Sequence, residues 1–328
     1  MARPNPITPG LLIGFIIAMA FGLALPHFVS DFTTYQFTLA ISWAVAMLGL
    51  NVLTGYNGQF SIGHSAFFAA GAYGAAIMIE HAGWGPYEAI VAAAFFSFIF
   101  GFLFGLPALR LEGLYLALAS FALAVATPQI LKFDAFEEMT GGVQGIFVPK
   151  PEPMMEGISA DQSLYYVAFG IMVFLMVITW CILKSRSGRA MMAIRDNPIA
   201  AVTMGINTPM VKTITFGISA MFAGIGGALF TYASEFVSPD AFNFFIAVYI
   251  LVGSVVGGIV SIPGAIFGGL FIVFMPNIAQ DLRLAYEWLP PPWAIFGVFL
   301  IVLIYFVPFG VWGSIERLVA WTKHKMAS

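Results

Sequence analysis

The chain has 328 residues, of which 60% are apolar and only 9% are charged, and its mean hydropathy is +0.94. A soluble domain carries about 25% charged residues, so this composition excludes a water-soluble enzyme. The 16% aromatic content excludes a disordered chain. Too few charges are present for a coiled coil, and the single cysteine, Cys181, excludes an internal disulfide. The composition therefore predicts an all-α protein folded in lipid.

Charge-free intervals predict where the helices cross the membrane. A spanning helix needs about 20 apolar residues, and a charge at its centre is costly. Two intervals, 32–79 and 241–280, are long enough for two helices each, which brings the expected total to about ten. The charge-free intervals are 4–30, 32–79, 89–109, 113–131, 162–183, 213–234, 241–280 and 288–315.

Turn-forming residues interrupt the two long intervals. The first contains Gly55-Tyr56-Asn57-Gly58-Gln59, and the second contains Gly257-Gly258 followed by Pro263-Gly264. Glycine, asparagine and proline favour turns over continued helix. Each long interval is therefore expected to form two helices around a break.

The positions of lysine and arginine predict the orientation. Ten spans beginning in the cytoplasm place ten cations inside and three outside, in agreement with the positive-inside rule. Both termini are then cytoplasmic. A cleaved signal peptide over residues 7–25 is the alternative for the first interval. The inner cations are Arg3, Arg110, Lys184, Arg186, Arg189, Arg195, Lys212, Arg317, Lys323 and Lys325, and the outer ones are Lys132, Lys150 and Arg283.

Two hydrophilic segments lie between the predicted spans. Residues 132–163 are acidic and are expected outside the cell, whereas residues 184–212 are basic and are expected in the cytoplasm. Neither is large enough for a separate enzymatic domain. Residues 1–328 are therefore expected to form one transmembrane domain.

Several kinds of chemistry have no signal in the sequence. The chain has no Gly-Lys dipeptide and hence no Walker A motif, and it has no Gly-x-Ser-x-Gly elbow. The four histidines, His27, His64, His81 and His324, do not have zinc-ligand spacing. No acidic or basic side chain lies inside a predicted span, whereas ion-coupled carriers usually have one there. We expect no metal, no cofactor and no catalytic residue, and an energy source on another protein.

Paired small residues predict close helix packing. The pairs Gly10/Gly14, Gly101/Gly105, Gly253/Gly257 and Gly264/Gly268 all have Gly-x-x-x-Gly spacing. This spacing lets helix backbones approach each other closely. The pairs are expected to pack helices within the bundle, and pairing with a second membrane subunit is the alternative.

A polar, glycine-rich segment stands out within the interval 32–79. Irregular backbone at membrane depth is tolerated only where it lines a cavity or is buried in protein, and broken helices often bind solutes in transporters. Uncharged polar groups would suit a solute whose own charges balance. A turn facing the cytoplasm, with His64 as an ordinary packed residue, is the alternative. The predicted solute-path residues are Asn51, Tyr56, Asn57, Gln59, Ser61 and His64.

The inner loop contains a helix-start signal at Asp196-Asn197-Pro198. A capping side chain followed by proline favours a helix from residue 199 to 204, and Gly205 ends it. Ala200 and Ala201 would present a smooth face to a groove on another protein. An ordinary connector is the alternative. The expected coupling residues are Arg195, Asp196, Asn197, Ala200, Ala201 and Gly205.

Four stretches of the chain together resemble one known family. Segment 49–74, which includes Gly71-Ala72-Tyr73, is similar to the signature of ABC-importer permeases for branched-chain amino acids, and specifically to the M-type subunit of the Liv family. The H-type subunit usually has Asn-Phe-Ala-His-Gly where this chain has Ser61-Ile62-Gly63-His64-Ser65. The other similar stretches are 109–118, 140–145 and 257–265.

The resemblance implies a complex in the bacterial inner membrane. Its partners would be an H-type permease, two ATP-binding subunits and a periplasmic solute-binding protein, with no role for nucleic acid. The fold would be a bundle of about ten helices like that of vitamin B12-type importers. The family's ATPase-docking element is Glu-Ala-Ala-x-x-x-Gly, and here Ile199 replaces the glutamate.

The function implied by the resemblance is import of branched-chain amino acids or similar small neutral or zwitterionic solutes. ATP hydrolysis would occur on the separate ATPase subunits, so this chain is not expected to be an enzyme. A carrier driven by an ion gradient is the alternative, and a membrane-embedded enzyme is a third, for which the sequence offers no catalytic constellation.

Overall fold

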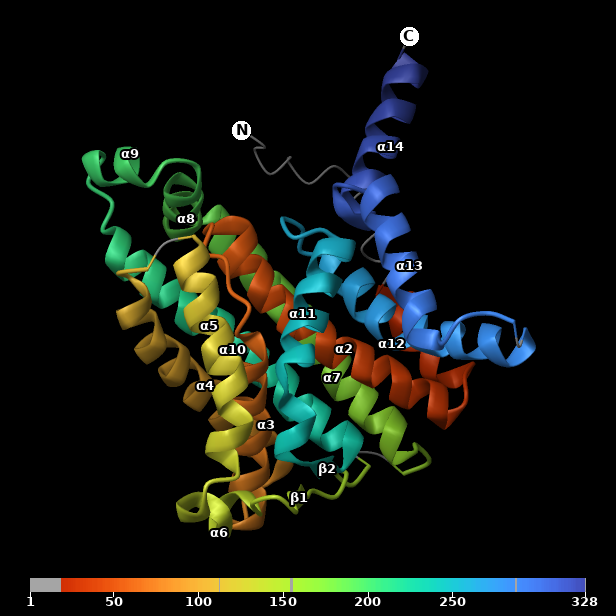
Figure 1. The fold of residues 1–328 in the computed structure, drawn as a ribbon. Coiled ribbons are helices and arrows are strands. Elements are labelled where there is room, and N and C mark those ends of the chain that lie inside the picture. The colour runs from red at the N-terminus through yellow and green to blue at the C-terminus, as the bar shows by residue number, and fades with distance from the viewer. Residues whose placement is uncertain (1–18, 112, 154–155, 287, 328) are drawn as a thin grey trace.

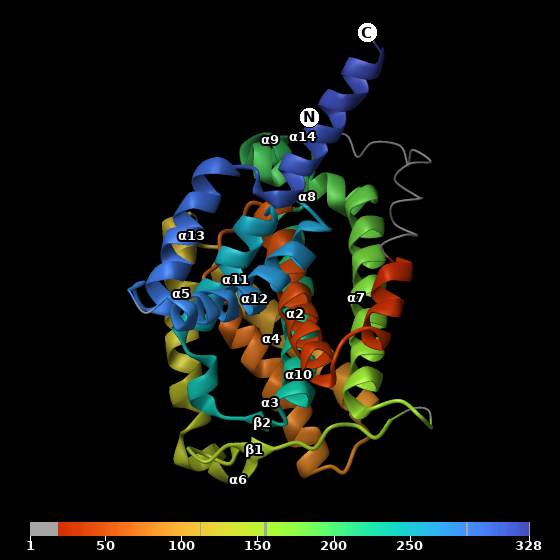
Figure 2. The same cartoon turned by 90° about the vertical axis from the view of Figure 1, so that its right-hand side faces the viewer.

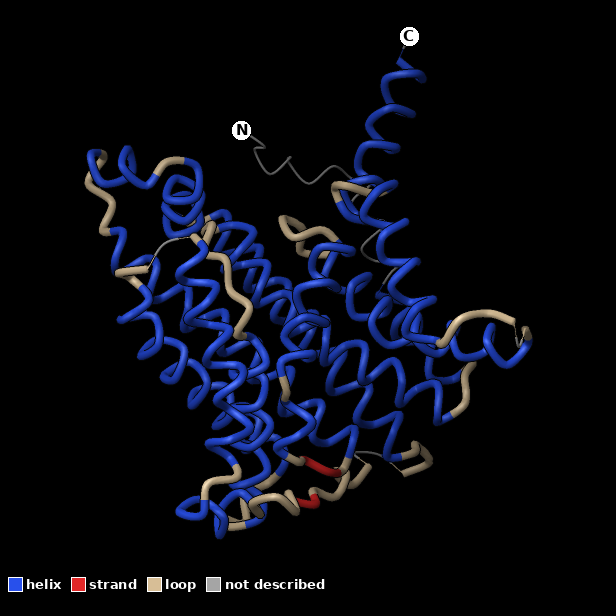
Figure 3. Tube along the Cα trace, in the orientation of Figure 1, coloured by secondary structure: helices blue, strands red, loops and turns tan. Residues whose placement is uncertain are grey.

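A computed structural model describes residues 19–111, 113–153, 156–286 and 288–327. Most of the described chain is helical (Figures 1 and 3). The α-helices are α2 (Asp31–Leu50), α3 (His64–Glu80), α4 (Pro86–Ala108), α5 (Leu114–Leu131), α6 (Glu137–Thr140), α7 (Ala160–Lys184), α8 (Arg186–Asp196), α9 (Pro198–Thr203), α10 (Thr208–Ser234), α11 (Phe244–Gly257), α12 (Gly264–Ala285), α13 (Pro292–Phe306) and α14 (Gly310–Ala327). The shorter elements are η1 (Leu25–His27), η2 (Asn51–Tyr56), η3 (Asp134–Phe136), η4 (Pro239–Phe242), β1 (Ile146–Phe147) and β2 (Phe236–Val237).

Helix α10 lies at the centre and packs against α2, α3 and α4. It is rich in glycine where it meets α3, and a Cβ on Gly71 of α3 would overlap the backbone of Gly224. The two helix backbones therefore touch, and the large side chains of Phe67, Phe216 and Phe222 fill the core around this contact. Small residues at the crossing of α3 and α10 allow the two helix backbones to approach this closely.

The peripheral helices expose their apolar side chains. Leu114 and Tyr115 of α5 are 74% and 72% exposed. Only 28% of the residues in the most apolar stretch of α5 are buried. In the most apolar stretch of α2 with η2, 83% of the residues are buried. An apolar exterior around a tightly packed interior is the pattern of a protein whose solvent is lipid.

Six described helices are long and apolar enough to cross a membrane. They are α2 with η2, α4, α5, α7, α10 and α12. Each overlaps an expected interval for most of its length, but only α5 lies wholly inside one, and α12 continues past residue 280 to include Asp281 and Arg283. Helix α3 has 17 residues, while α11 and α13 are shorter apolar helices. Most of the first expected interval, 4–30, precedes residue 19 and so lies outside the described residues. The structure is therefore a polytopic helical bundle, and the count of ten remains a prediction.

The two hydrophilic segments lie at opposite ends of the bundle (Figures 1 and 2). Helices α8, α9 and α14 are at one end, which we call the elbow end. Helix α6 and strands β1 and β2 are at the other, which we call the strand end. There β1 pairs antiparallel with β2, with Ile146 opposite Val237.

Both predicted breaks are present. Residues 57–63 separate η2 from α3, and residues 258–263 separate α11 from α12. The last interval, 288–315, was expected to form one helix, and this was wrong: α13 ends at Phe306 and α14 starts at Gly310. The chain turns between them at Pro308, because proline cannot donate the next helical hydrogen bond.

The glycine pairs pack helices within the bundle, as predicted. A Cβ on Gly257 of α11 would overlap the backbone of Gly264 on α12, and one on Gly268 would overlap Gly253. A Cβ on Gly101 of α4 would overlap the Cβ of Ala220 on α10. The remaining pair, Gly10/Gly14, lies outside the described residues.

Candidate functional site

The polar segment that follows α2 folds back into the bundle. Helix α2 continues as a π-helix, η2, and residues 57–63 then run back beside it to the start of α3. The Ser219 hydroxyl bridges the His64 side chain and the carbonyl oxygen of Gly49 by two hydrogen bonds. Gly49 lies seven residues before the end of η2, so the His64 side chain is linked to a point within α2 and not to the end of η2. The segment thus folds back into the bundle, with Asn57, Gln59, Ser61 and His64 buried, while Gly58 and Phe60 are exposed.

Hydrogen bonds define the state of His64, which is 1% exposed. The Ser219 hydroxyl donates to the carbonyl oxygen of Gly49 at 2.7 Å, so its oxygen accepts from His64 Nε2 at 2.8 Å. The Nδ1 atom is then the acceptor for the Ser61 hydroxyl at 3.3 Å. His64 therefore joins α3, α10 and α2 through buried hydroxyl groups.

Helix α5 supports the same segment. The backbone N–H of Ile62 donates to Ser120 Oγ at 2.9 Å, and Gly63 packs against the backbone of Ser120. Neither Ser120 nor Ser219 was singled out from the sequence. Each is a serine in a mostly apolar stretch of its helix, and that was the available signal.

The structure brings all six predicted solute-path residues into this region, but two of them also hold a neighbouring loop. Asn51 Nδ2 donates to the carbonyl oxygen of Ser261 at 3.0 Å, and the Tyr56 hydroxyl donates to that of Val260 at 2.8 Å. Asn57 Nδ2 donates to Gln59 Oε1 at 2.6 Å. The buried Oδ1 atoms of Asn51 and Asn57 have no hydrogen-bond partner within the described chain.

The elbow end contains the helix predicted in the inner loop. Helix α9 spans Pro198–Thr203, Asn197 Oδ1 accepts from the N–H of Ala200 at 3.0 Å, and Gly205 follows with a φ of +80°. The start signal and the terminating glycine were therefore interpreted correctly. Helix α8, which precedes it, was not predicted.

The exposed face of α9 differs from the predicted one. Ala201 was expected to face a partner, but it is only 3% exposed because it packs against this chain. Ala200 is exposed as predicted. Ile199, Val202 and Met204 are 78%, 57% and 81% exposed, so the outward face is bulky and apolar. An exposed apolar patch on a short helix outside the bundle makes this face a candidate interaction site.

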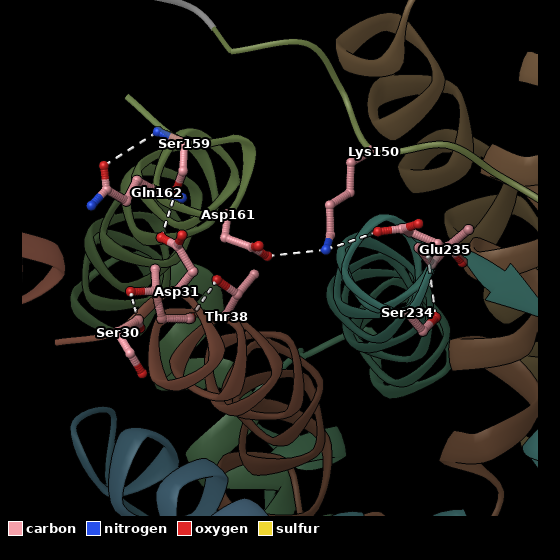
Figure 4. Close-up of polar contacts among 11 residues, drawn as sticks. Ser30, Asp31, Thr38, Lys150, Ser159, Asp161, Gln162, Ser234 and Glu235 are labelled. Carbon is pink, nitrogen blue, oxygen red and sulfur yellow. Dashed lines mark hydrogen bonds and ion pairs between the residues drawn. The ribbon is translucent and has the colours of Figure 1, made fainter. Parts of the chain in front are cut away.

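The strand end is held by ionic contacts (Figure 4). Lys150 Nζ lies between Asp161 Oδ1, at the start of α7, and Glu235 Oε1, at the end of α10, at 3.1 and 2.8 Å. The Tyr35 ring of α2 is 5.6 Å from the same ammonium group. Burial lowers the pKa of Lys150, but the hydrogen bonds to Glu235 and Asp161 outweigh burial and raise the pKa above its ordinary value.

Among the described residues, no group of three or more histidine, cysteine, aspartate or glutamate side chains lies close enough to hold a metal ion. The chemistry that this arrangement offers is therefore neutral hydrogen bonding inside the bundle and apolar contact at the elbow.

Comparison with known proteins identifies the family. Residues 32–308 match the model of the branched-chain amino acid transport system permease component. The chain is 31% identical to the high-affinity branched-chain amino acid transport system permease protein LivM of Escherichia coli K12, over 82% of this chain and 69% of that protein. It is 25% identical to LivH of the same strain, over 85% and 94%.

A more distant relative is the probable branched-chain amino acid transport permease protein LivM of Methanocaldococcus jannaschii, with 23% identity over 68% of this chain and 67% of that protein. No solved structure matches the chain. The family model covers most of the chain, including the polar segment and the elbow. The chain therefore belongs to the family of permease components of branched-chain amino acid transport systems.

Proposed function

We propose that this permease belongs to an ATP-driven importer that carries branched-chain amino acids, or similar small neutral or zwitterionic solutes, from the periplasm to the cytoplasm. Its complex would contain an H-type permease, two ATP-binding subunits and a periplasmic solute-binding protein. The chain would lie in the bacterial inner membrane as one domain of about ten spans, with a fold like that of vitamin B12-type importers and both termini cytoplasmic.

The observation that carries the proposal is the apolar face of α9 at the elbow end. Three large side chains there are more than half exposed, on a helix too short to be stable without support. The cations of the segment 184–212 flank it in the sequence, as expected for a cytoplasmic position. A separate ATPase that covers this face would supply the energy for transport.

Reconstitution with the partner subunits tests the proposal. We expect ATP-dependent uptake of leucine in proteoliposomes and loss of this uptake when residues 196–205 are deleted. Uptake that survives the deletion would contradict docking at α9. Uptake by the purified chain alone, abolished by an uncoupler and indifferent to ATP, would favour the ion-driven carrier instead.

We further propose that the polar segment borders the solute path. Its unpartnered amide oxygens at Asn51 and Asn57 are uncharged acceptors that would suit the ammonium group of a zwitterion. We expect Asn57→Ala and Gln59→Ala to reduce uptake with normal membrane insertion. Asn277→Ala is the matched control, because the Asn277 amide donates only to the carbonyl oxygen of Val273 in its own helix in the described contacts. Unchanged uptake in both test variants would remove the segment from the path.

A further inference from the structure

A single arginine connects the elbow to the polar segment. Arg195, in the last turn of α8, donates from Nη1 to the carbonyl oxygen of Gly55 in the π-helix η2 at 2.9 Å. Its Nε and Nη2 atoms both donate to Asp196 Oδ1 at 3.0 Å. The neighbouring carboxylate thus holds the guanidinium in one orientation, with the remaining donor pointing at η2.

The stem of the same arginine packs against the turn that follows η2. Gly58 has a φ of +73°, and a Cβ there would lie 2.9 to 3.2 Å from the Cγ, Cα and Cβ atoms of Arg195. Only glycine allows both this backbone conformation and this close contact. Movement of the end of α8 toward this turn would therefore displace Gly58, because no space separates them.

The opposite side of η2 is held by another part of the chain. A Cβ on Gly55 would overlap the carbonyl oxygen of Ile259, and the Tyr56 hydroxyl bonds to Val260. The π-helix is therefore clamped between α8 and the loop 258–263. A force applied at α8 acts against a fixed support, so it would deform η2 itself.

The π-helix is suited to such deformation. Helices with i→i+5 hydrogen bonds are rare, and π-helical turns occur frequently at functional sites. Its end is joined to the polar segment, because Gln59 N–H donates to the carbonyl oxygen of Leu53 and the Thr54 hydroxyl donates to that of Gln59. A change in η2 thus reaches Gln59 and the residues up to His64.

We propose that Arg195 is a positioning residue that transmits movement of the α8–α9 elbow through the Gly55 carbonyl to η2 and the segment 57–64. The inference rests on the proposed function, since it needs a motor that moves the elbow. It predicts that loss of the Arg195 contact uncouples ATP hydrolysis from movement of the polar segment without preventing docking.

The test uses the complex of this chain with its partner subunits and binding protein, in proteoliposomes. We compare Arg195→Ala with Arg189→Ala, a matched control on the same helix whose guanidinium donates to the carbonyl oxygen of Lys184. We expect Arg195→Ala to keep its ATP turnover but to take up about ten-fold less leucine per ATP, the size of effect that follows from losing a hydrogen bond to a charged group. Arg195→Lys should restore part of this ratio, and Arg189→Ala should leave it unchanged.

A second readout does not depend on the solute. Phe60 lies in the polar segment and is 39% exposed, so Phe60→Cys in a Cys181→Ser background gives a single thiol for maleimide labelling. We expect ATP with vanadate to change its labelling rate when Arg195 is present and to have no effect in Arg195→Ala. An Arg195→Ala complex that keeps both the uptake ratio and the ATP-dependent labelling change would overturn the proposal.

The two readouts separate failure of this inference from failure of the proposed function. A wild-type complex that hydrolyses ATP and shows the labelling change, but takes up no leucine, contradicts the proposed solute and leaves the Arg195 link supported. A wild-type complex in which ATP does not alter labelling contradicts the link itself. Lower thermal stability of Arg195→Ala with an unchanged uptake ratio would mean that Arg195 is only a structural anchor.

Discussion

The two ends of the bundle are held together in different ways. At the strand end, Lys150 joins α7 and α10 through two carboxylates, and β1 pairs with β2. At the elbow end, the contacts between α8, η2 and the loop 258–263 are hydrogen bonds to backbone carbonyls and close glycine contacts. Ionic contacts join several elements at the strand end. At the elbow end, α8 and the loop 258–263 pack closely against the π-helix η2.

This difference indicates which end changes shape. The strand end resists relative movement of its helices, because the ionic contacts of Lys150 and the β1–β2 pairing would have to break together. A π-helix held by a few directional hydrogen bonds can rearrange at lower cost. We therefore expect movement to enter the molecule at the elbow end, with the strand end as the fixed reference.

The largest expected effect comes from overfilling the elbow end. In Gly55→Ala, the new methyl group would overlap the carbonyl oxygen of Ile259, and a backbone atom cannot move aside as a side chain can. We expect a loss of about 3 kcal/mol or more, measured as a lower Tm of the chain in detergent. Gly170→Ala on α7 is the control, because nothing lies within 4 Å of its Cβ position. A normal Tm for Gly55→Ala would mean that η2 is not clamped.

A smaller effect is expected where the polar segment is anchored. Ser219→Ala removes the bridge between His64 and the Gly49 carbonyl and leaves a buried imidazole N–H without its acceptor. We expect a loss of about 1 to 3 kcal/mol in thermal unfolding, together with reduced uptake. Thr215→Val, on the same helix, loses only a bond to the carbonyl oxygen of Val211 and should cost less. Equal effects of the two variants would argue against the bridge.

A substitution at the strand end should lower the stability of the chain and leave its uptake per ATP unchanged. Lys150→Met leaves Asp161 and Glu235 without their shared cation, and we expect a loss of about 1 kcal/mol, since partly exposed ion pairs contribute little each. Uptake per ATP should not change. A variant with a normal Tm but a lower uptake ratio would reverse the roles that we assign to the two ends.

The stability that Lys150 contributes should depend on pH, because its pKa is raised in the folded chain. A group whose pKa is raised by folding favours the folded state while it is protonated. Its contribution is complete below the pKa of an unfolded lysine, about 10.4, and is lost as the pH rises through the folded value. The Tm difference between wild type and Lys150→Met should therefore be constant from pH 6 to about 9 and shrink in more alkaline solution. A difference that varies across neutral pH would contradict this assignment.

The smallest effect on stability is expected at α9. Asn197→Ala removes the cap from a six-residue helix, a local cost of about 1 kcal/mol, but α9 lies outside the bundle and should hardly change its Tm. Uptake should nevertheless fall, because α9 would fray and its exposed apolar face would no longer be held in place for docking. Asn207→Ala removes the cap of α10, which tertiary contacts hold in place, so its uptake should be normal. Normal uptake in Asn197→Ala would separate α9 from coupling.

Local signals in the sequence predicted much of the architecture. Charge-free intervals predicted where the apolar helices lie, because the lipid solvent penalises every charge that it contacts. Asn197-Pro198 and Gly205 predicted the ends of α9, because capping and left-handed turns depend on a few adjacent residues. Glycine pairs such as Gly253/Gly257 predicted close packing, although not which helix each pair meets.

Contacts between distant residues decided the rest. The return of the polar segment into the bundle depends on Ser120 and Ser219, which lie far from it in the sequence. The inward position of Ala201 and the bond from Arg195 to Gly55 likewise depend on how α8 and α9 pack against the bundle. Sequence patterns record each segment's preference for lipid, water or a turn, and they determined the helical membrane bundle and its elbow. Only the tertiary structure could decide which polar groups meet, because a hydrogen bond needs two partners that the pattern of one segment does not specify.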